Sequence, residues 1–149
     1  MDKNDSLHYL LIAPQSESYQ PHRTLITTIL REIGIESVSL EERKWTPGEL
    51  VTQSLMQEVK ERLIKGIEQA DFIIADLTGS DPNVMYNVGF AHALRKPLLL
   101  IVQSQESRIP ASLGGHYFLV YDPSEPDELR ASLQRWVGRL VVEAEKERA

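Results

Sequence analysis

Three short and almost continuous apolar runs constrain the fold of this chain more than any other feature of its sequence. They are "LHYLLIAP" (7–14), "DFIIADL" (71–77) and "PLLLIVQ" (97–103). A strand has this appearance when both of its faces are buried, as happens in a parallel sheet that is covered by helices. Two further strands are predicted: "IESVSL" (35–40) alternates polar and apolar residues, as expected near a sheet edge, and "HYFLVYD" (116–122) is the fifth.

Amphipathic stretches separate these runs and predict helices. The first helix follows a polar loop and is expected to stop at Gly34, a residue typical of helix ends. Its apolar positions have helical spacing: Leu25, Ile26, Ile29, Leu30 and Ile33. Further helices are predicted over 54–69 and 83–96, and a last one begins within "PSEPDEL", with Ser124 or Asp127 as its cap, and frays in "EAEKERA".

Strands that alternate with helices in this way predict an α/β fold, because parallel neighbouring strands need crossover connections. We expect a three-layer, flavodoxin-like sandwich whose five-stranded, mainly parallel sheet has the order 2-1-3-4-5, with helices on both faces. The 149 residues suit a single domain spanning 1–149. In such sheets ligands bind beyond the carboxyl ends of the strands, here the ends of the first and third strands.

Composition narrows the classes of partner. The chain has no cysteine, which excludes disulfides and thiolate chemistry and fits a reducing compartment, so the cytoplasm is the expected location. A net charge of -6 gives no electrostatic basis for binding duplex nucleic acid. No apolar stretch is long enough to cross a bilayer, so we expect neither a membrane anchor nor a signal peptide.

Polar residues crowd the expected edge of the sheet in "ADLTGSDPNVMYNVGFAHAL" (75–94). Asn83 is predicted to cap the following helix, after a turn made by Asp81 and its neighbours. Asn87 lies one helical turn further on the same face, and Asp76 ends the third strand. Turn formation alone would explain part of this pattern, but the edge position makes Asn87, Asp81 and Asp76 candidate ligand contacts.

The loop after the first strand supplies a second set of candidates. Tyr19 offers a ring for stacking as well as a hydroxyl, and Gln15 could contact the edge of a base. The alternative is that this serine-rich loop is simply solvated. The complete set of predicted ligand-binding residues is Pro14, Gln15, Ser16, Ser18, Tyr19, Thr78, Gly79 and Asn83.

Other motifs carry weaker predictions. Arg43 and Lys44 could meet a phosphate, and Trp45 either belongs to a lid over the site or anchors its loop to the core. The histidines have no metal-ligand spacing, so no metal is predicted. The glycines of "SLGGHYF" match no dinucleotide-binding, phosphate-loop or serine-hydrolase pattern, and those three classes of enzyme are unsupported.

The segment "ADFIIADLTGSDPNVMYNVGFAHALRKPLLLI" (70–101) resembles the signature of the Toll/interleukin-1 receptor-like and nucleoside 2-deoxyribosyltransferase-like proteins. "APQSESYQ" (13–20) is similar to the first ligand loop of that superfamily, and "HYFLVYD" with the last helix to its final unit. The resemblance implies a ligand with an N-glycosidic bond, namely a nucleoside, a nucleotide or NAD as substrate, with no separate cofactor required. It also places Asn87 where the superfamily has a catalytic glutamate.

An amide in place of that glutamate leaves two main hypotheses. Asn87 is uncharged and a poor nucleophile, so an active enzyme would need another carboxylate, for which Asp81 and Asp76 are nearest in sequence. Alternatively the chain is a nucleotide-binding or signalling module that acts through self-association, and a homo-oligomer is then expected. An interaction domain with a vestigial cleft and a residue altered at position 87 to trap ligand are further alternatives.

Overall fold

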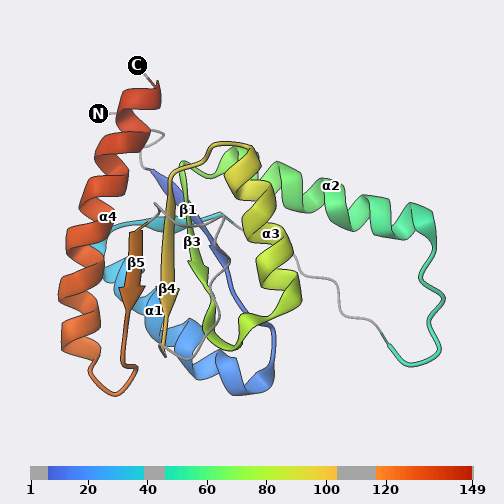
Figure 1. Ribbon diagram of the computed structural model, residues 1–149, viewed down its shortest axis with the longest axis horizontal. Coiled ribbons are helices and arrows are strands. Elements are labelled where there is room, and N and C mark those ends of the chain that lie inside the picture. The colour runs from blue at the N-terminus through green and yellow to red at the C-terminus, as the bar shows by residue number, and fades with distance from the viewer. Residues whose placement is uncertain (1–6, 39–45, 104–116, 149) are drawn as a thin grey trace.

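The structure is a computed structural model that describes residues 7–38, 46–103 and 117–148. It is an α/β sandwich around one five-stranded sheet with the order β2-β1-β3-β4-β5, in which every neighbouring pair of strands is parallel (Figure 1). The strands are β1 His8–Ile12, β2 Glu36–Ser37, β3 Phe72–Asp76, β4 Leu98–Val102 and β5 Tyr117–Val120. The predicted architecture and strand order are therefore confirmed.

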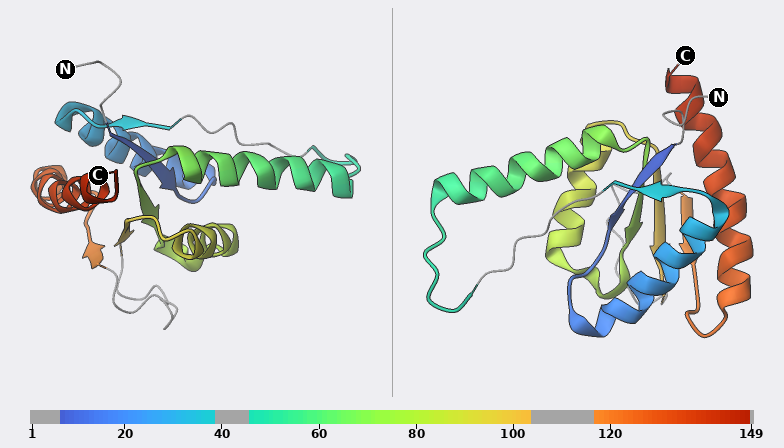
Figure 2. Two further views of the ribbon diagram at one scale, coloured as in Figure 1. Left: turned by 90° about the horizontal axis from the view of Figure 1, so that it is seen from above. Right: turned by 180° about the vertical axis from the view of Figure 1, so that it is seen from behind.

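Among the described residues, four helices cover the two faces of the sheet. They are α1 Gln20–Ile33, α2 Gln53–Gln69, α3 Pro82–Ala93 and α4 Pro126–Arg148, with two 3-10 turns, η1 Glu17–Tyr19 and η2 Thr78–Ser80. Seen from above, α1 and α4 lie on one side of the sheet and α2 and α3 on the other (Figure 2). Within the part of the chain that the structure describes, no helix is both long and apolar enough to cross a membrane.

The two faces of the sheet form two separate cores, because successive side chains along a strand point to opposite faces. Phe72 and Ile74 of β3 pack with α1 and α4, whereas Ile73 and Ala75 pack with α2 and α3. Every residue of β3 and β4 is buried, as their continuous apolar sequences predicted. This alternation also fixes the face to which Asp76, the last residue of β3, is directed.

The helix ends follow local capping chemistry. α1 stops at Gly34, which has a φ of 98° and donates its N–H to the carbonyls of Arg31 and Leu30, as predicted. α2 starts after Thr52, whose hydroxyl accepts the Leu55 N–H, a cap that the sequence analysis missed. At the other end of α2, the Lys96 Nζ donates to the carbonyls of Glu68 (3.1 Å) and Ala70 (2.8 Å).

Several predicted boundaries were wrong. α3 begins at Pro82 and its cap is Asp81 rather than Asn83. α4 begins at Pro126, which places Asp127 inside the helix, while Ser124 forms a turn with the carboxylate of the residue two positions before it. α4 also remains helical through Arg148 instead of fraying. β2 is only two residues long, both exposed, and the end of its predicted range lies outside the described residues.

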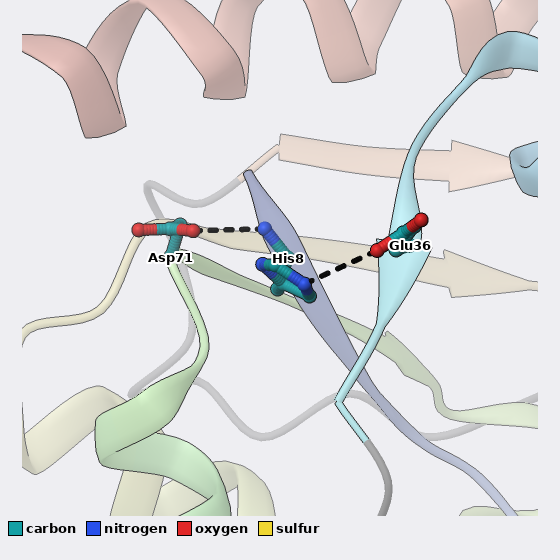
Figure 3. Close-up of polar contacts among 3 residues, drawn as sticks. All are labelled: His8, Glu36 and Asp71. Atoms are coloured by element: carbon teal, nitrogen blue, oxygen red, sulfur yellow. Dashed lines mark hydrogen bonds and ion pairs between the residues drawn. The ribbon is translucent and has the colours of Figure 1, made fainter. Parts of the chain in front are cut away.

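At the amino-terminal rim of the sheet, polar contacts tie β1 to its neighbours (Figure 3). The Asp71 carboxylate accepts the backbone N–H of His8 at 2.8 Å, and the His8 Nε2 lies 3.4 Å from an oxygen of Glu36 on β2. Asp71 directly precedes β3 and so lies at the rim where this strand begins. It is therefore remote from the carboxyl ends of the strands, where ligands are expected.

Candidate functional site

Two cavities lie next to each other at β1 and the loop that follows it. The smaller, of about 60 Å³, lies between the end of this strand and the first turns of α3, and the larger, of about 610 Å³, lies along α1 and β2. Leu11 and Gln15 line both cavities. Gln15 is therefore placed to contact a ligand in either cavity.

The smaller cavity brings together residues that are far apart in the sequence. Asn87 is partly buried and lines it together with Asn83, which lies one helical turn earlier on α3. Asp81 lines it as well, and its Oδ1 accepts the backbone N–H groups of Asn83 (2.9 Å) and Val84 (3.1 Å). Because both hydrogen bonds use one carboxylate oxygen, the helix start holds Asp81 in place while Oδ2 remains for a ligand.

α1 supplies part of the polar lining of the larger cavity. Gln20, Arg23 and Thr27 follow one another at helical spacing, and Ser37 contributes from β2. Arg23 Nη2 also donates to the backbone carbonyls of Ala13 (3.5 Å) and Pro14 (3.4 Å). The sequence analysis missed this group, although the polar spacing opposite the apolar face of α1 was a usable signal.

A buried hydrogen-bond network lies beside the cavities, centred on Asp76. This carboxylate has no exposed surface. Its Oδ2 accepts the hydroxyls of Tyr19 (2.7 Å) and Tyr121 (2.5 Å). Its Oδ1 accepts the backbone N–H of Thr78 (3.0 Å) and the Thr78 hydroxyl (2.5 Å). All four donors are neutral groups, and each oxygen of the carboxylate is satisfied twice.

The network reaches the ends of two more strands. Gln103, directly after β4, donates its side-chain amide to the Tyr121 hydroxyl at 3.0 Å and its backbone N–H to the Thr78 hydroxyl at 3.0 Å. Burial raises the pKa of Tyr19 and of Tyr121, and the charge of Asp76 raises both further, so the two phenols stay neutral donors. Tyr121 and Gln103 were missed, yet both follow strands at the edge where polar residues were expected.

Asp76 does not point into the cleft, which differs from the sequence-based expectation. It continues the alternation of Phe72 and Ile74 and therefore faces the side of the sheet that α1 and α4 cover, whereas Asn87 projects from α3 on the other side. Tyr19 is likewise 4% exposed and lines neither cavity. The structure thus pairs these two candidate residues with each other, and of the three predicted catalytic residues only Asn87 and Asp81 share a cavity.

The other predicted ligand-binding residues lie outside both cavities. Ser16 and Ser18 are exposed, with their hydroxyl oxygens 3.2 Å apart, and Pro14 is buried. Thr78 belongs to the Asp76 network, and Gly79 has a φ of 78° within η2. Contacts between these residues and a ligand stay predictions. Arg43, Lys44 and Trp45, predicted to bind phosphate or form a lid, lie outside the described residues.

A comparison with known families shows to which family the chain belongs. The profile of the family described as nucleoside 2-deoxyribosyltransferase matches residues 13–143. The chain belongs to the nucleoside 2-deoxyribosyltransferase family. The matched range contains Gln15, Asp81 and Asn87, so the polar residues of the smaller cavity fall within the family domain.

Individual relatives agree with this assignment. The chain is 32% identical over 85 residues to the 5-hydroxymethyl-dUMP N-hydrolase of Mus musculus, a match that covers 54% of this chain and 49% of that protein. The match therefore spans about half the length of this curated relative.

Two solved structures share the fold of this nucleoside 2-deoxyribosyltransferase family member. The 2-deoxyribosyltransferase of Bacillus psychrosaccharolyticus has a TM-score of 0.62 at 19% identity, over 79% of this chain and 88% of that chain. The CMP N-glycosidase of Clostridium botulinum has a TM-score of 0.59 at 18% identity, over 87% and 98% of the two chains. The deoxyribosyltransferase side of the sequence resemblance is thus confirmed, and its Toll/interleukin-1 receptor side stays a prediction.

Proposed function

We propose that the chain binds a nucleoside or nucleoside monophosphate at the carboxyl end of β1 and cleaves or transfers its N-glycosidic bond. The sugar lies at the smaller cavity and the rest of the ligand extends past Gln15 into the larger one, whose volume is typical of small-molecule sites. The observation that carries the proposal is that Asn87 and Asp81 line one cavity at this edge. Relatives named for action on 5-hydroxymethyl-dUMP and CMP support the class of ligand.

Asn87 is assigned to holding the sugar. Its amide can accept a hydrogen bond through Oδ1 and donate two through Nδ2, which suits neighbouring hydroxyl groups. The amide has no negative charge with which to attack the anomeric carbon or to stabilise an oxocarbenium-like transition state. Asn87 therefore binds and orients the sugar, and the charge must come from another residue.

Asp81 is assigned to supplying that charge. When the C–N bond breaks, its electron pair leaves with the base and positive charge develops on the sugar ring, where a nearby carboxylate stabilises it. In the hydrolytic reaction, water attacks the anomeric carbon and Oδ2 of Asp81 accepts a proton from it, while the departing base takes a proton from solvent. Asp81 then releases its proton to solvent, which restores the carboxylate. The two backbone N–H groups on Oδ1 hold the carboxylate in place during these steps.

The test is release of free base from CMP, dUMP, 5-hydroxymethyl-dUMP, deoxynucleosides and NAD, with three variants compared with the unaltered chain. Asp81→Asn keeps a good helix cap and removes only the charge, so base release should fall by about 100-fold or more while the melting temperature is retained. Asn87→Glu should increase release. Gln134→Glu adds the same charge at an exposed position of α4, on the other face of the sheet, and should change nothing.

Binding without turnover is a second candidate, and the amide at position 87 favours it. In that case nucleotides raise the melting temperature of the unaltered chain, no base is released, and Asn87→Glu alone gains activity. Self-association measured by sedimentation with and without nucleotide would then report the signalling output. Both candidates are contradicted if the unaltered chain and Asn87→Glu alike release no base and show no ligand-dependent shift in melting temperature.

A further inference from the structure

The Asp76 network connects the interior of the sheet to the loop that carries Gln15. We propose that Tyr19 is a positioning residue whose hydrogen bond to Asp76 holds the β1–α1 loop so that Gln15 stays at the junction of the two cavities. The consequence for ligand binding rests on the function proposed above. Tyr19 itself contacts no ligand, because its side chain is buried and lines neither cavity.

The geometry of the loop carries the first step. The Tyr19 N–H donates to the carbonyl of Ser16 at 3.1 Å, closing the turn that directly follows Gln15. The Tyr19 hydroxyl anchors this turn through the 2.7 Å bond to Asp76. Arg23 gives the loop weaker support, since its Nη2 reaches the carbonyls of Ala13 and Pro14 only at 3.5 and 3.4 Å.

The second step concerns the quality of Asp76 as an anchor. It ends β3, which pairs with β1 on one side and β4 on the other, so its position is fixed by the middle of the sheet. A hydrogen bond to a carboxylate is about twice as strong as one between neutral groups. Thr78 holds the other oxygen of the same carboxylate through two bonds. The β1–α1 loop is therefore hydrogen-bonded to a central strand of the sheet rather than to another loop.

Tyr121 provides a matched control within the same network. Its hydroxyl donates to the same oxygen of Asp76 as that of Tyr19, but it follows β5 on the far side of β4 and does not belong to the Gln15 loop. It also accepts a hydrogen bond from Gln103, so its removal costs at least as many hydrogen bonds. Tyr19→Phe and Tyr121→Phe both keep the ring, and differ in which part of the site they release.

The first experiment measures the dissociation constants of CMP and dUMP by calorimetry, together with the melting temperature of each protein. Tyr19→Phe should weaken binding by about 3- to 10-fold, the range of one net hydrogen bond. Tyr121→Phe should lower the melting temperature at least as much and change affinity by less than about 2-fold. Equal weakening of binding in both variants, or no weakening in Tyr19→Phe, would overturn the proposal.

The second experiment needs no ligand, so it separates this proposal from the proposed function. Hydrogen–deuterium exchange should accelerate across residues 14–19 in Tyr19→Phe and remain unchanged there in Tyr121→Phe. Equal exchange in this segment in both variants would refute the positioning role. Selective acceleration in a protein that binds neither CMP nor dUMP would uphold the positioning role and count against the nucleotide function alone.

Discussion

Substitution of Asp76 by Asn tests how much the buried network contributes to stability. The substitution keeps the shape of the side chain but turns one acceptor oxygen into an amino group. All four groups around Asp76 are donors: two tyrosine hydroxyls at Oδ2, and the Thr78 N–H and hydroxyl at Oδ1. The backbone N–H of Thr78 cannot rotate, so the amide oxygen must stay on that side and the new NH₂ group must face Tyr19 and Tyr121.

The magnitude follows from this conflict. The tyrosine hydroxyls can rotate to accept hydrogen bonds from the new N–H groups, but they then no longer donate hydrogen bonds to a carboxylate. Each hydrogen bond to a charged group is worth about 1.5–3 kcal/mol, and an unsatisfied buried donor costs about 1–3 kcal/mol. Relief from burying a charge offsets part of this loss. We therefore expect a loss of about 2–4 kcal/mol in the free energy of unfolding, or roughly 5–15 °C in melting temperature for a chain of this size.

Urea denaturation followed by circular dichroism measures the loss, with Glu143→Gln as the control. Glu143 is exposed on α4, so removing its charge should change stability by less than about 0.5 kcal/mol. A loss below about 1 kcal/mol in Asp76→Asn, with an unchanged denaturant slope, would refute the reasoning. It would show that the cost of burying the charge cancels the hydrogen bonds that the carboxylate accepts.

Three further predictions concern the fold. Tyr19 and Tyr121 have raised pKa values, so the native state keeps their protons at a pH at which the unfolded chain has lost them. Their contribution to the free energy of unfolding should be fully present below about pH 10. Above that pH it should fall by up to about 1.4 kcal/mol per pH unit for each tyrosine. Urea titrations over this range should show a shallower fall in Tyr121→Phe, and an unchanged fall would contradict the assignment. Ile74→Ala, at a fully buried position of β3, should cost about 2–5 kcal/mol by the same titration, and a cost under about 1 kcal/mol would indicate a looser core. Gly34→Ala should destabilise by about 1 kcal/mol because of its left-handed φ, whereas Gly138→Ala, within α4 and with open space around the added Cβ, should stabilise by about as much; shifts of the same sign would contradict this pair of expectations.

The sheet could be predicted because its signals are local. Residues 72–76 and 98–102 read as doubly buried strands, and the structure buries every one of them. The start of α3 was less clear, since Asp81 and Asn83 are both good caps on either side of Pro82. Proline is favoured at the first helical position, and that preference points to Asp81 as the cap.

The candidate site was predictable only in part, because its contacts join distant segments. Asn87 could be placed at the cleft from helical spacing and the edge rule. The bond from Tyr19 to Asp76 spans 57 residues, and that from Tyr121 spans 45, so no local pattern reveals either. The orientation of Asp76 could have been predicted from the alternation along β3. Its side chain lies on the same face of the sheet as Phe72 and Ile74, and this face is turned away from α3.

Asp81 caps α3 and lines the smaller cavity at the same time, and this shapes how the family member can change over time. A mutation to alanine would remove the start of α3 together with the charge at the cavity, so it is penalised twice. A mutation to asparagine would keep the helix cap and remove only the negative charge, because aspartate and asparagine cap helices equally well. Under the proposed function, a single conservative exchange would therefore separate an active enzyme from a folded protein that binds its nucleotide without cleaving it.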